Sequence, residues 1–427
     1  MMKKRYLFLI IIVCLFTISA VSAEEINNKT NEHDSNIITE SVDNNNLTEN
    51  SATFTELQNL INDNNVINLT KDYNAVKYEG RVHINGDKII NGYGHVISGN
   101  DKNGIFKIDS GKIIFNDMVI KNGHSESEDD NSGGAINALK AASLTLNNVT
   151  FLNNHARLSG GAVITSAPLN IVNCTFVSNR ANGEKGCWNG WGGAVYGHST
   201  TINIKNCIFQ DNYANREGGA IFTPNNDNSD IIINNSTFLN NHANWKGGAI
   251  NGYSVTWVDS PSYFIGNQGN GGGAIYTRKF NTDVKYGVFI NNTCKSSSYD
   301  GGAIYIFTEN HVTFSQCYFE NNHCGDEGGA IYLDSYSSHL SLRDNVFIDN
   351  SAGSKGQIVY NCGYYDEIKN NWYGTNNFDF TDQFKECHWY GDEDHADSNP
   401  ALVPLFCVSG VCAHDTKNIT DLIINSK

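Results

Sequence analysis

The unit Gly-Gly-Ala-Ile, or its variant with Val in the last position, occurs eight times in this chain of 427 residues. Successive copies lie 25 to 32 residues apart. Self-similarity with a period of roughly 20 to 50 residues is typical of a solenoid, in which each repeat packs only on its neighbours. The chain is therefore predicted to fold as a stack of coils. The copies begin at Gly133, Gly160, Gly192, Gly218, Gly247, Gly272, Gly301 and Gly328.

A second unit, Phe-x-x-Asn, alternates with the first and also occurs eight times. An Asn, Gln or Asp precedes most of these phenylalanines by three residues, and a small residue follows each by five. Differences in repeat length are concentrated between that small residue and the next Gly-Gly pair, so one loop accepts insertions while the rest of the repeat keeps its register. The phenylalanines are Phe151, Phe176, Phe209, Phe238, Phe264, Phe289, Phe319 and Phe347.

Each repeat holds three short strand patterns, which match one coil of a parallel β-helix. Stacked coils place equivalent residues over one another at about 4.8 Å. Phe319 is therefore predicted to fill the interior, and Asn322 to lie at a bend where its amide hydrogen-bonds along the stack and its backbone is left-handed. Gly328 and Gly329 are expected where a β-carbon would collide with a neighbouring coil. A helical solenoid is excluded, because the repeats lack runs of ten residues with helical periodicity.

The two ends of the repeat region have patterns of their own. Thr53 and Glu56 form a capping-box pattern at the start of a helix, which we expect to cover the open end of the first coil. The apolar face of this helix is predicted to consist of Phe54, Leu57, Leu60 and Ile61. Residues 354–361 look like a ninth strand that has lost its glycine pair, and Trp372 and Tyr373 are predicted to close the last coil.

The chain is predicted to have four segments. Residues 1–23 are basic, then apolar, then small, which indicates a cleaved secretory signal peptide. A retained membrane anchor is the alternative, although the apolar run is short for a span, and no later stretch is apolar enough to cross a bilayer. Residues 24–52 are an Asn-rich leader predicted to be disordered, residues 53–378 the β-helix with its N-terminal cap helix, and residues 379–427 a C-terminal cap and tail.

The charge and the cysteine pattern limit the possible partners and cofactors. The formal net charge of −16 disfavours nucleic acid. No cysteine pair has zinc-site spacing, and residues 387–399 and 225–230 match no standard metal site, so we expect neither a cofactor nor a metal. Cys407 and Cys412, and also Cys294 with Cys324, are placed so that a disulfide is open to them. Cys174 and Cys207 are expected to stack as small apolar side chains.

Aromatic residues recur directly after the Gly-Gly-Ala-Ile unit. If the Ile side chain points inward, alternation along the strand points the next residue outward, which gives an aromatic stripe suited to sugar rings or a protein partner. The alternative is that stacked rings only protect the sheet surface. The candidate ligand-binding residues are Tyr196, Phe222, Tyr276, Tyr305 and Tyr332 in the stripe and Trp188, Trp191 and Trp245 in the loops before the Gly-Gly pairs.

The two repeat units resemble the polymorphic outer membrane protein repeat of chlamydial autotransporters. The wider layout, with FTELQNLIND, KIINGYGHVISG and NNWYGTN around the repeats, is similar to the adhesin-like proteins of methanogenic archaea. The resemblance covers residues 53–378. It implies a right-handed β-helix that is exported, exposed at the cell surface and engaged in attachment to glycans or proteins of host or neighbouring cells.

Two other functions are open to a chain of this fold. Right-handed β-helices include polysaccharide lyases and glycoside hydrolases, which need acidic residues grouped on one face. Here Asp211 and Asp349 share a column, but Asn and Gly stand on the coils between them. Glu217 and Glu327 share another column, with Lys246 and Asp300 between them, so the acidic residues are scattered. We therefore expect no catalytic residues. A purely structural protein of the cell envelope is the remaining alternative.

Overall fold

The computed structural model describes most of the chain from residue 51 onward. The predicted signal peptide lies outside the described residues. Among the described residues, no helix is long and apolar enough to cross a membrane. The described residues are 51–77, 79–126, 131–184, 189–224, 226, 228–307, 311–375, 379–387, 393–397, 400, 407–408 and 411–412.

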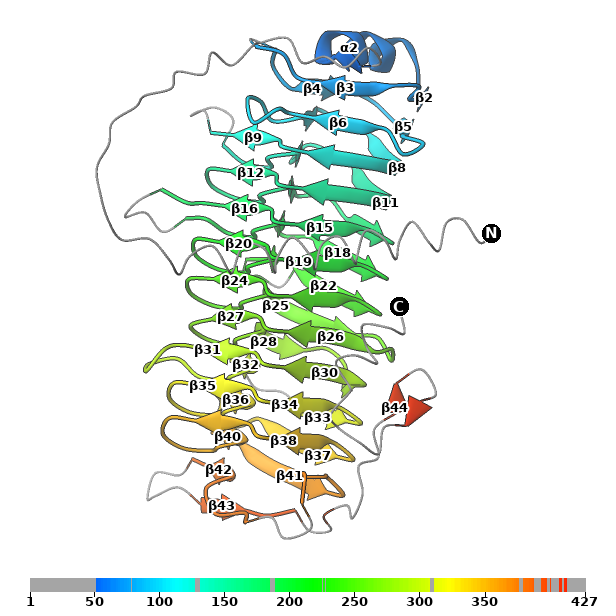
Figure 1. Cartoon of the computed structure of the whole chain (residues 1–427). Helices are drawn as coiled ribbons and strands as arrows, with labels where there is room; N and C mark the ends of the chain where they lie inside the picture. The colour runs from blue at the N-terminus through cyan, green and yellow to red at the C-terminus, as the bar shows by residue number, and fades with distance from the viewer. Residues whose placement is uncertain are drawn as a thin grey trace, which may run out of the picture. The chain divides into compact units, whose positions relative to one another are not determined.

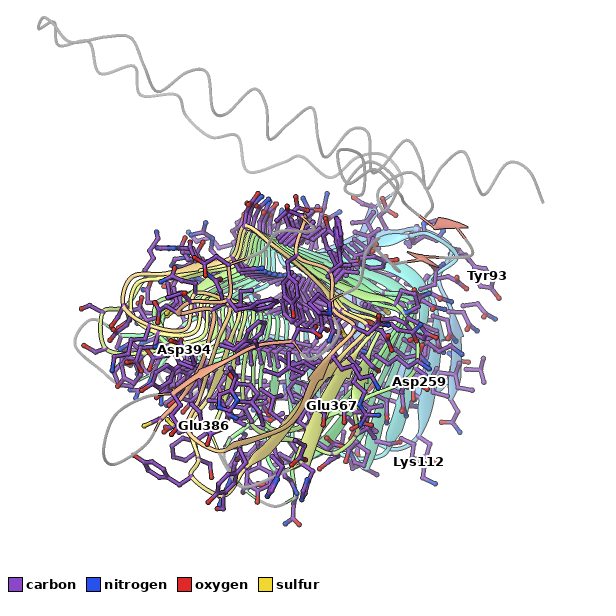
Figure 2. The ribbon with its side chains drawn as sticks, turned by 90° about the horizontal axis from the view of Figure 1, so that it is seen from below. Tyr93, Lys112, Asp259, Glu367, Glu386 and Asp394 are labelled. Carbon is purple, nitrogen blue, oxygen red and sulfur yellow. The ribbon has the colours of Figure 1, made fainter. Side chains whose placement is uncertain are left out.

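The predicted all-β parallel solenoid is confirmed: the strands form about 11 turns. Figure 1 shows them stacked in chain order, from the blue strands beside the helix α2 (Phe54–Asp63) to the orange strands β41 (Tyr364–Lys369) and β43 (Glu393–His395). Figure 2 views this stack from below, along its length, with Glu386 and Glu367 labelled at the near end. Four parallel ladders run along the stack. They are called below the glycine ladder, the middle ladder, the phenylalanine ladder and the short ladder.

The glycine ladder follows the Gly-Gly-Ala-Ile units. It consists of β4 (Val82–Ile84), β7 (Phe106–Ile108), β10 (Ile136–Ala138), β13 (Val163–Thr165), β17 (Val195–Gly197), β21 (Ile221–Phe222), β25 (Ile250–Trp257), β28 (Ile275–Phe280), β32 (Ile304–Ile306), β36 (Ile331–Leu333), β40 (Val359–Asn361) and β42 (Phe384–Glu386).

The middle ladder carries the apolar-x-apolar segments and has two parts. The first consists of β2 (Val66–Asn68), β5 (Lys88–Asn91), β8 (Lys112–Lys121), β11 (Ser143–Leu152), β14 (Leu169–Val172), β18 (Thr201–Lys205), β22 (Asp230–Asn234) and β25. The second consists of β29 (Val284–Lys285), β33 (His311–Ser315), β37 (His339–Arg343) and β41 (Tyr364–Lys369).

The phenylalanine ladder carries the Phe-x-x-Asn units, and the short ladder follows it in each coil. The phenylalanine ladder consists of β1 (Ser51–Thr53), β3 (Asp72–Asn74), β6 (Val96–Ser98), β8, β11, β15 (Thr175–Val177), β19 (Ile208–Gln210), β23 (Thr237–Leu239), β26 (Ser262–Ile265), β30 (Gly287–Ile290), β34 (Tyr318–Glu320) and β38 (Val346–Ile348). The short ladder consists of β9 (His124–Ser125), β12 (His155–Ala156), β16 (Arg180–Ala181), β20 (Tyr213–Ala214), β24 (His242–Ala243), β27 (Gln268–Gly269), β31 (Thr293–Cys294), β35 (His323–Cys324) and β39 (Ser351–Ala352).

The interior is a continuous stack of apolar side chains in register. Phe319 is fully buried and pairs across the ladder with Phe289 and Phe347, as predicted. Successive phenylalanine rings from Phe151 to Phe347 stack with centroids 4.6 to 5.2 Å apart. Burying one such side chain contributes about 2 to 3 kcal/mol to folding, so the column is a main source of stability.

The fourth residue of each Phe-x-x-Asn unit forms a buried amide ladder. Asn322 donates from Nδ2 to Oδ1 of Asn350 at 2.9 Å and to the carbonyl of Phe289 at 2.9 Å. The backbone of Asn322 is not left-handed, so that part of the prediction is wrong. The preceding residue, Asn321, has a φ of 50°. The left-handed bend and the amide ladder therefore belong to two adjacent residues.

The glycine pair has the predicted steric role. Gly328 has a φ of 66°. A β-carbon on Gly302 would lie 1.9 Å from the carbonyl oxygen of Gly329 on the next coil. The ninth copy keeps its first glycine, Gly356, with a φ of 60°. The second glycine is replaced by Gln357 and the alanine by Ile358.

Both ends of the solenoid are covered. At the N-terminal end, α2 (Phe54–Asp63) has the predicted capping box between Thr53 and Glu56 and buries Phe54, Leu57 and Ile61. At the C-terminal end, β42 extends the glycine ladder into residues that were assigned to the cap. The strand β43 (Glu393–His395) then pairs antiparallel to β42 and ends the parallel ladder. A separate antiparallel pair follows, of β44 (Cys407–Val408) and β45 (Val411–Cys412).

Candidate binding site: a break in an aromatic column

An aromatic column follows the outer side of the glycine ladder, as alternation along the strands predicts. It consists of Tyr196, Phe222, Tyr276, Tyr305, Tyr332 and Tyr360. Tyr305, Tyr332 and Tyr360 form an apolar cluster with Cys362, separate from the interior core. Ring centroids of neighbours in the column lie 4.7 to 5.6 Å apart. Such contacts contribute about 0.5 to 1.5 kcal/mol each beyond the area that they bury.

The rings present less surface to solvent than a free stripe would. Tyr305 is 6% exposed and Tyr332 is 8% exposed, because each ring lies between its neighbours. Tyr305 also donates a hydrogen bond from its hydroxyl to Asp334 at 2.5 Å. Tyr305, Tyr332 and Tyr360 therefore stabilise the sheet. This agrees with the alternative considered for the stripe, in which stacked rings protect the sheet surface.

The column is interrupted on one coil. In the ladder register Asn251 stands between Phe222 on one side and Tyr276 on the other. Two coil spacings, about 9.6 Å, separate these aromatic positions. That separation is wide enough for one flat ring, although the ammonium of Lys246 lies over the Tyr276 ring, 4.4 Å from its centroid, and takes part of the space on that side. Asn251 is shorter than the aromatic residues and does not fill this rung of the column.

A cleft of about 290 Å³ lies at this interruption. Phe222 and Tyr276 are on its walls, so it includes two of the predicted ligand-binding residues. The exposed ring of Phe307 also lines it. The full set of lining residues is Glu217, Phe222, Thr223, Lys246, Asn251, Gly252, Tyr253, Tyr276, Arg278 and Phe307.

Charged groups stand beside the aromatic walls. The ammonium of Lys246 lies 4.4 Å from the centroid of the Tyr276 ring and donates to the Tyr276 hydroxyl at 3.0 Å. Burial lowers the pKa of Lys246, and Glu217 opposes that shift. Burial raises the pKa of Glu217, while Arg216 and Lys246 act in the other direction. Glu217 is the one carboxylate among the described residues that line the cleft.

Two of the three predicted tryptophans lie beside the column, and the third, Trp188, lies outside the described residues. The ring of Trp191 lies 6.1 Å from Phe222 and 6.5 Å from Tyr196. Trp245 contacts Arg216, whose guanidinium carbon is 4.6 Å from the ring centroid, and packs on Tyr299. These indole rings extend the aromatic surface along the edge of the cleft.

The sequence analysis missed three lining residues: Tyr253, Arg278 and Phe307. Each follows the last residue of a Gly-Gly-Ala-Ile unit by three positions, on three successive coils, so they occupy one equivalent position of the repeat. Arg278 lies over Tyr253, with its guanidinium carbon 5.2 Å from the ring centroid. The signal that could have indicated the site was Asn251 itself, a polar residue on one rung of an otherwise aromatic column.

The remaining predicted sites are placed as follows. Cys174, Cys207, Cys294 and Cys324 are buried free thiols. Cys407 and Cys412 are opposite each other in the antiparallel pair, but their side chains are outside the described part of the structure. In the acidic segment 387–399, Nε2 of His395 lies 3.1 Å from a carboxylate oxygen of Glu386, and His388 is not described.

Four segments of the chain match the family model of the Chlamydia polymorphic membrane protein repeat: residues 206–224, 235–253, 261–278 and 316–334. The chain carries polymorphic membrane protein repeats. The first three of these repeats contain Phe222, Asn251 and Tyr276, so the cleft lies within them. No curated protein and no solved structure matches the chain.

Proposed function

We propose that this protein is a surface or secreted recognition protein that binds glycans in the cleft at Asn251. The polymorphic membrane protein repeats and the β-solenoid support a surface-associated role. The single observation that carries the ligand class is the missing rung, an opening between Phe222 and Tyr276.

A pyranose ring fits the chemistry of this cleft. Its apolar face stacks on aromatic rings, and its hydroxyl groups need donors and acceptors at the rim. Lys246 and Arg278 supply donors, and Glu217 and Thr223 supply acceptors. The half-buried position of Lys246 strengthens its interaction with a ligand oxygen, since the local dielectric is lower than that of water.

A glycan-cleaving enzyme and a structural envelope protein are the competing functions. Hydrolysis by the usual mechanism needs two carboxyl groups on opposite sides of the scissile bond. The cleft offers Glu217 alone among the described lining residues. An envelope protein without a ligand would not need an opening in the column. Recognition therefore accounts for more of the observed arrangement than either alternative.

The test is retention of the purified protein on a panel of host and plant polysaccharides, with a parallel assay for new chain ends. We expect retention without release, and we expect Phe222→Ala to weaken retention at least tenfold. Tyr93→Ala is the control, because Tyr93 is 66% exposed and belongs to one of the first coils, between β5 and β6, several coils before the cleft. Release of chain ends would instead identify an enzyme. If Phe222→Ala and Tyr93→Ala are retained equally well, the glycan does not bind in the cleft.

A further inference from the structure

Two histidines and one aspartate meet on three successive coils, on a different ladder from the cleft. His311 begins β33 and His339 begins β37, and the two residues are paired in the ladder. Their rings stack with centroids 4.3 Å apart and an interplanar angle of 17°. Nδ1 of His339 lies 2.6 Å from one oxygen of Asp366, and Nδ1 of His311 lies 3.4 Å from the other.

A β-bulge brings Asp366 to the histidines. Along β37 and β41, Leu340 is paired with Tyr365, but the next pair is Ser341 with Glu367. Asp366 is therefore an extra residue without a partner in the ladder. A bulge of this kind redirects a side chain while the flanking residues keep their inward and outward faces. Here it lets Ile368 stay paired with the inward Leu342.

The cationic side chains near Asp366 pair with its neighbour Glu367, and Asp366 faces the two imidazoles. Arg343 lies 2.7 Å from a carboxylate oxygen of Glu367, and Lys369 lies 3.9 Å from the other oxygen. These two cations are therefore directed to Glu367. Tyr364 packs on His339 from the next coil, with ring centroids 5.3 Å apart. Its ring limits the orientations that the His339 imidazole can adopt.

We propose that His311, His339 and Asp366 bind a divalent transition-metal ion, with Zn²⁺ as the best match. The three ligand atoms all lie within 4.8 Å of one another. Tetrahedral zinc with bonds of about 2.0 to 2.1 Å places its ligands about 3.3 Å apart. The His339–Asp366 contact must therefore open slightly, and the stacked imidazoles must rotate so that the lone pair in each ring plane points at the ion. Two imidazoles and one carboxylate suit Zn²⁺, Co²⁺ or Ni²⁺, whereas Ca²⁺ and Mg²⁺ prefer oxygen ligands.

The exposure of the cluster fits an exchangeable site. The side chains of His311 and Asp366 are 77% and 42% exposed, so they can adjust around an ion. The open side leaves a fourth position for water or for a group from a partner. Because the ligands come from three successive coils, the bound ion would also join these coils near the C-terminal end of the solenoid.

A second cluster, of His124, Glu126 and His155, has a similar composition but a less suitable environment. Nε2 of His155 already lies 2.5 Å from Nδ2 of Asn182. The pKa of His155 is lowered by burial first and by His124 second, and Arg180 on the next coil adds positive charge. This cluster serves as an internal comparison.

The test is calorimetric titration of Zn²⁺ into chelator-treated protein that carries no histidine tag, together with the absorption spectrum of the Co²⁺ form. We expect one ion per chain, a spectrum typical of low coordination number, and a higher melting temperature with the metal. Asp366→Asn and His311→Ala should each weaken binding by roughly tenfold or more. His323→Ala and His155→Ala are the controls and should leave the affinity unchanged.

The results separate the possible outcomes. Circular dichroism of each metal-free variant establishes that it is folded, and His311 is exposed enough that its loss should not perturb the coil. Binding that survives Asp366→Asn but is lost in His155→Ala would overturn the proposal in favour of the second cluster. If the native protein binds Zn²⁺ no more tightly than the His311→Ala, Asp366→Asn double variant does, the proposal is overturned. The three residues would then form only an ion pair.

Discussion

Nδ2 of Asn212 donates a hydrogen bond to Oδ1 of Asn241 at 2.9 Å, and Asn241 repeats the same bond to Asn267 at 3.0 Å. Each amide in this ladder is fully used. Asn241 also donates to the carbonyl of Phe209, and its Oδ1 accepts from the backbone of Asn212. A buried amide with all its partners in place stabilises one register of the coils over any shifted register, because a slipped coil would leave several polar groups without partners.

Loss of a central amide should therefore be costly. Asn241→Ala removes four hydrogen bonds and leaves their partners buried, which we expect to lower the free energy of unfolding by about 3 to 5 kcal/mol. Asn350→Ala, at the partly exposed end of the ladder, should lower it by clearly less. Urea unfolding followed by circular dichroism measures both. Equal losses for the two variants would contradict a role for burial.

The second glycine of each pair should tolerate no side chain. In Gly302→Ala the new β-carbon meets the carbonyl of Gly329 at 1.9 Å, so the two coils must separate. We expect a loss of about 3 kcal/mol or more, or failure to fold. Gly80→Ala is the matched control, since no atom lies within 4 Å of the position of its β-carbon. The melting temperatures of the two variants provide the comparison, and a near-native value for Gly302→Ala would contradict the steric argument.

Filling the interrupted rung should abolish recognition without damaging the fold. In Asn251→Tyr the new ring is expected to stack between Phe222 and Tyr276 and to occupy the cleft. Glycan retention should fall at least tenfold, while the melting temperature stays the same or rises. Asn251→Ala keeps the cleft open and should retain binding within a few fold. If Asn251→Tyr binds as well as the native protein, the ligand does not enter this cleft.

Asp300 should make stability depend on pH. Burial raises the pKa of Asp300 to about 6, above its usual value of 3.8. The folded protein then holds a proton that the unfolded chain has released, so stability falls as pH rises from about 4 to about 6 and levels off above that range. Asp300→Asn should remove this dependence and stabilise the protein at pH 7, because no charge is then buried. We expect a gain of about 1 to 2 kcal/mol, since solvent reaches part of the carboxyl group and reduces the cost of its charge. Melting temperatures measured across this pH range check the sign.

Much of the fold follows from the sequence because each rung repeats the same chemistry. The eight copies of Phe-x-x-Asn predict the stacked rings and the buried amides. The left-handed bend was assigned to the wrong residue because Asn occupies both positions in copies such as Asn321 and Asn322. Other copies separate the two roles: Ser178 and Asp211 stand at the bend, whereas the buried position is Asn in every copy.

The candidate sites were predictable only in part. The aromatic column follows from alternation, but the cleft depends on which residues of separate coils meet, as Tyr253 and Arg278 do. The histidine cluster depends on one extra residue in β41. Nothing in the local sequence around Asp366 distinguishes a bulge from a regular strand, since the difference appears only when the strand is paired with β37.

The column and the core are carried by alternate residues of the same strands. Exchanging an aromatic residue for a small polar one alters the outer face of a coil while the isoleucine beside it keeps its place in the interior. A single substitution can therefore open or close one rung of the column, at the cost of the stacking contacts that the replaced ring made, while the interior column is unchanged. The outer face of such a solenoid can be altered one coil at a time, because the side chains of the interior come from the alternate residues of each strand.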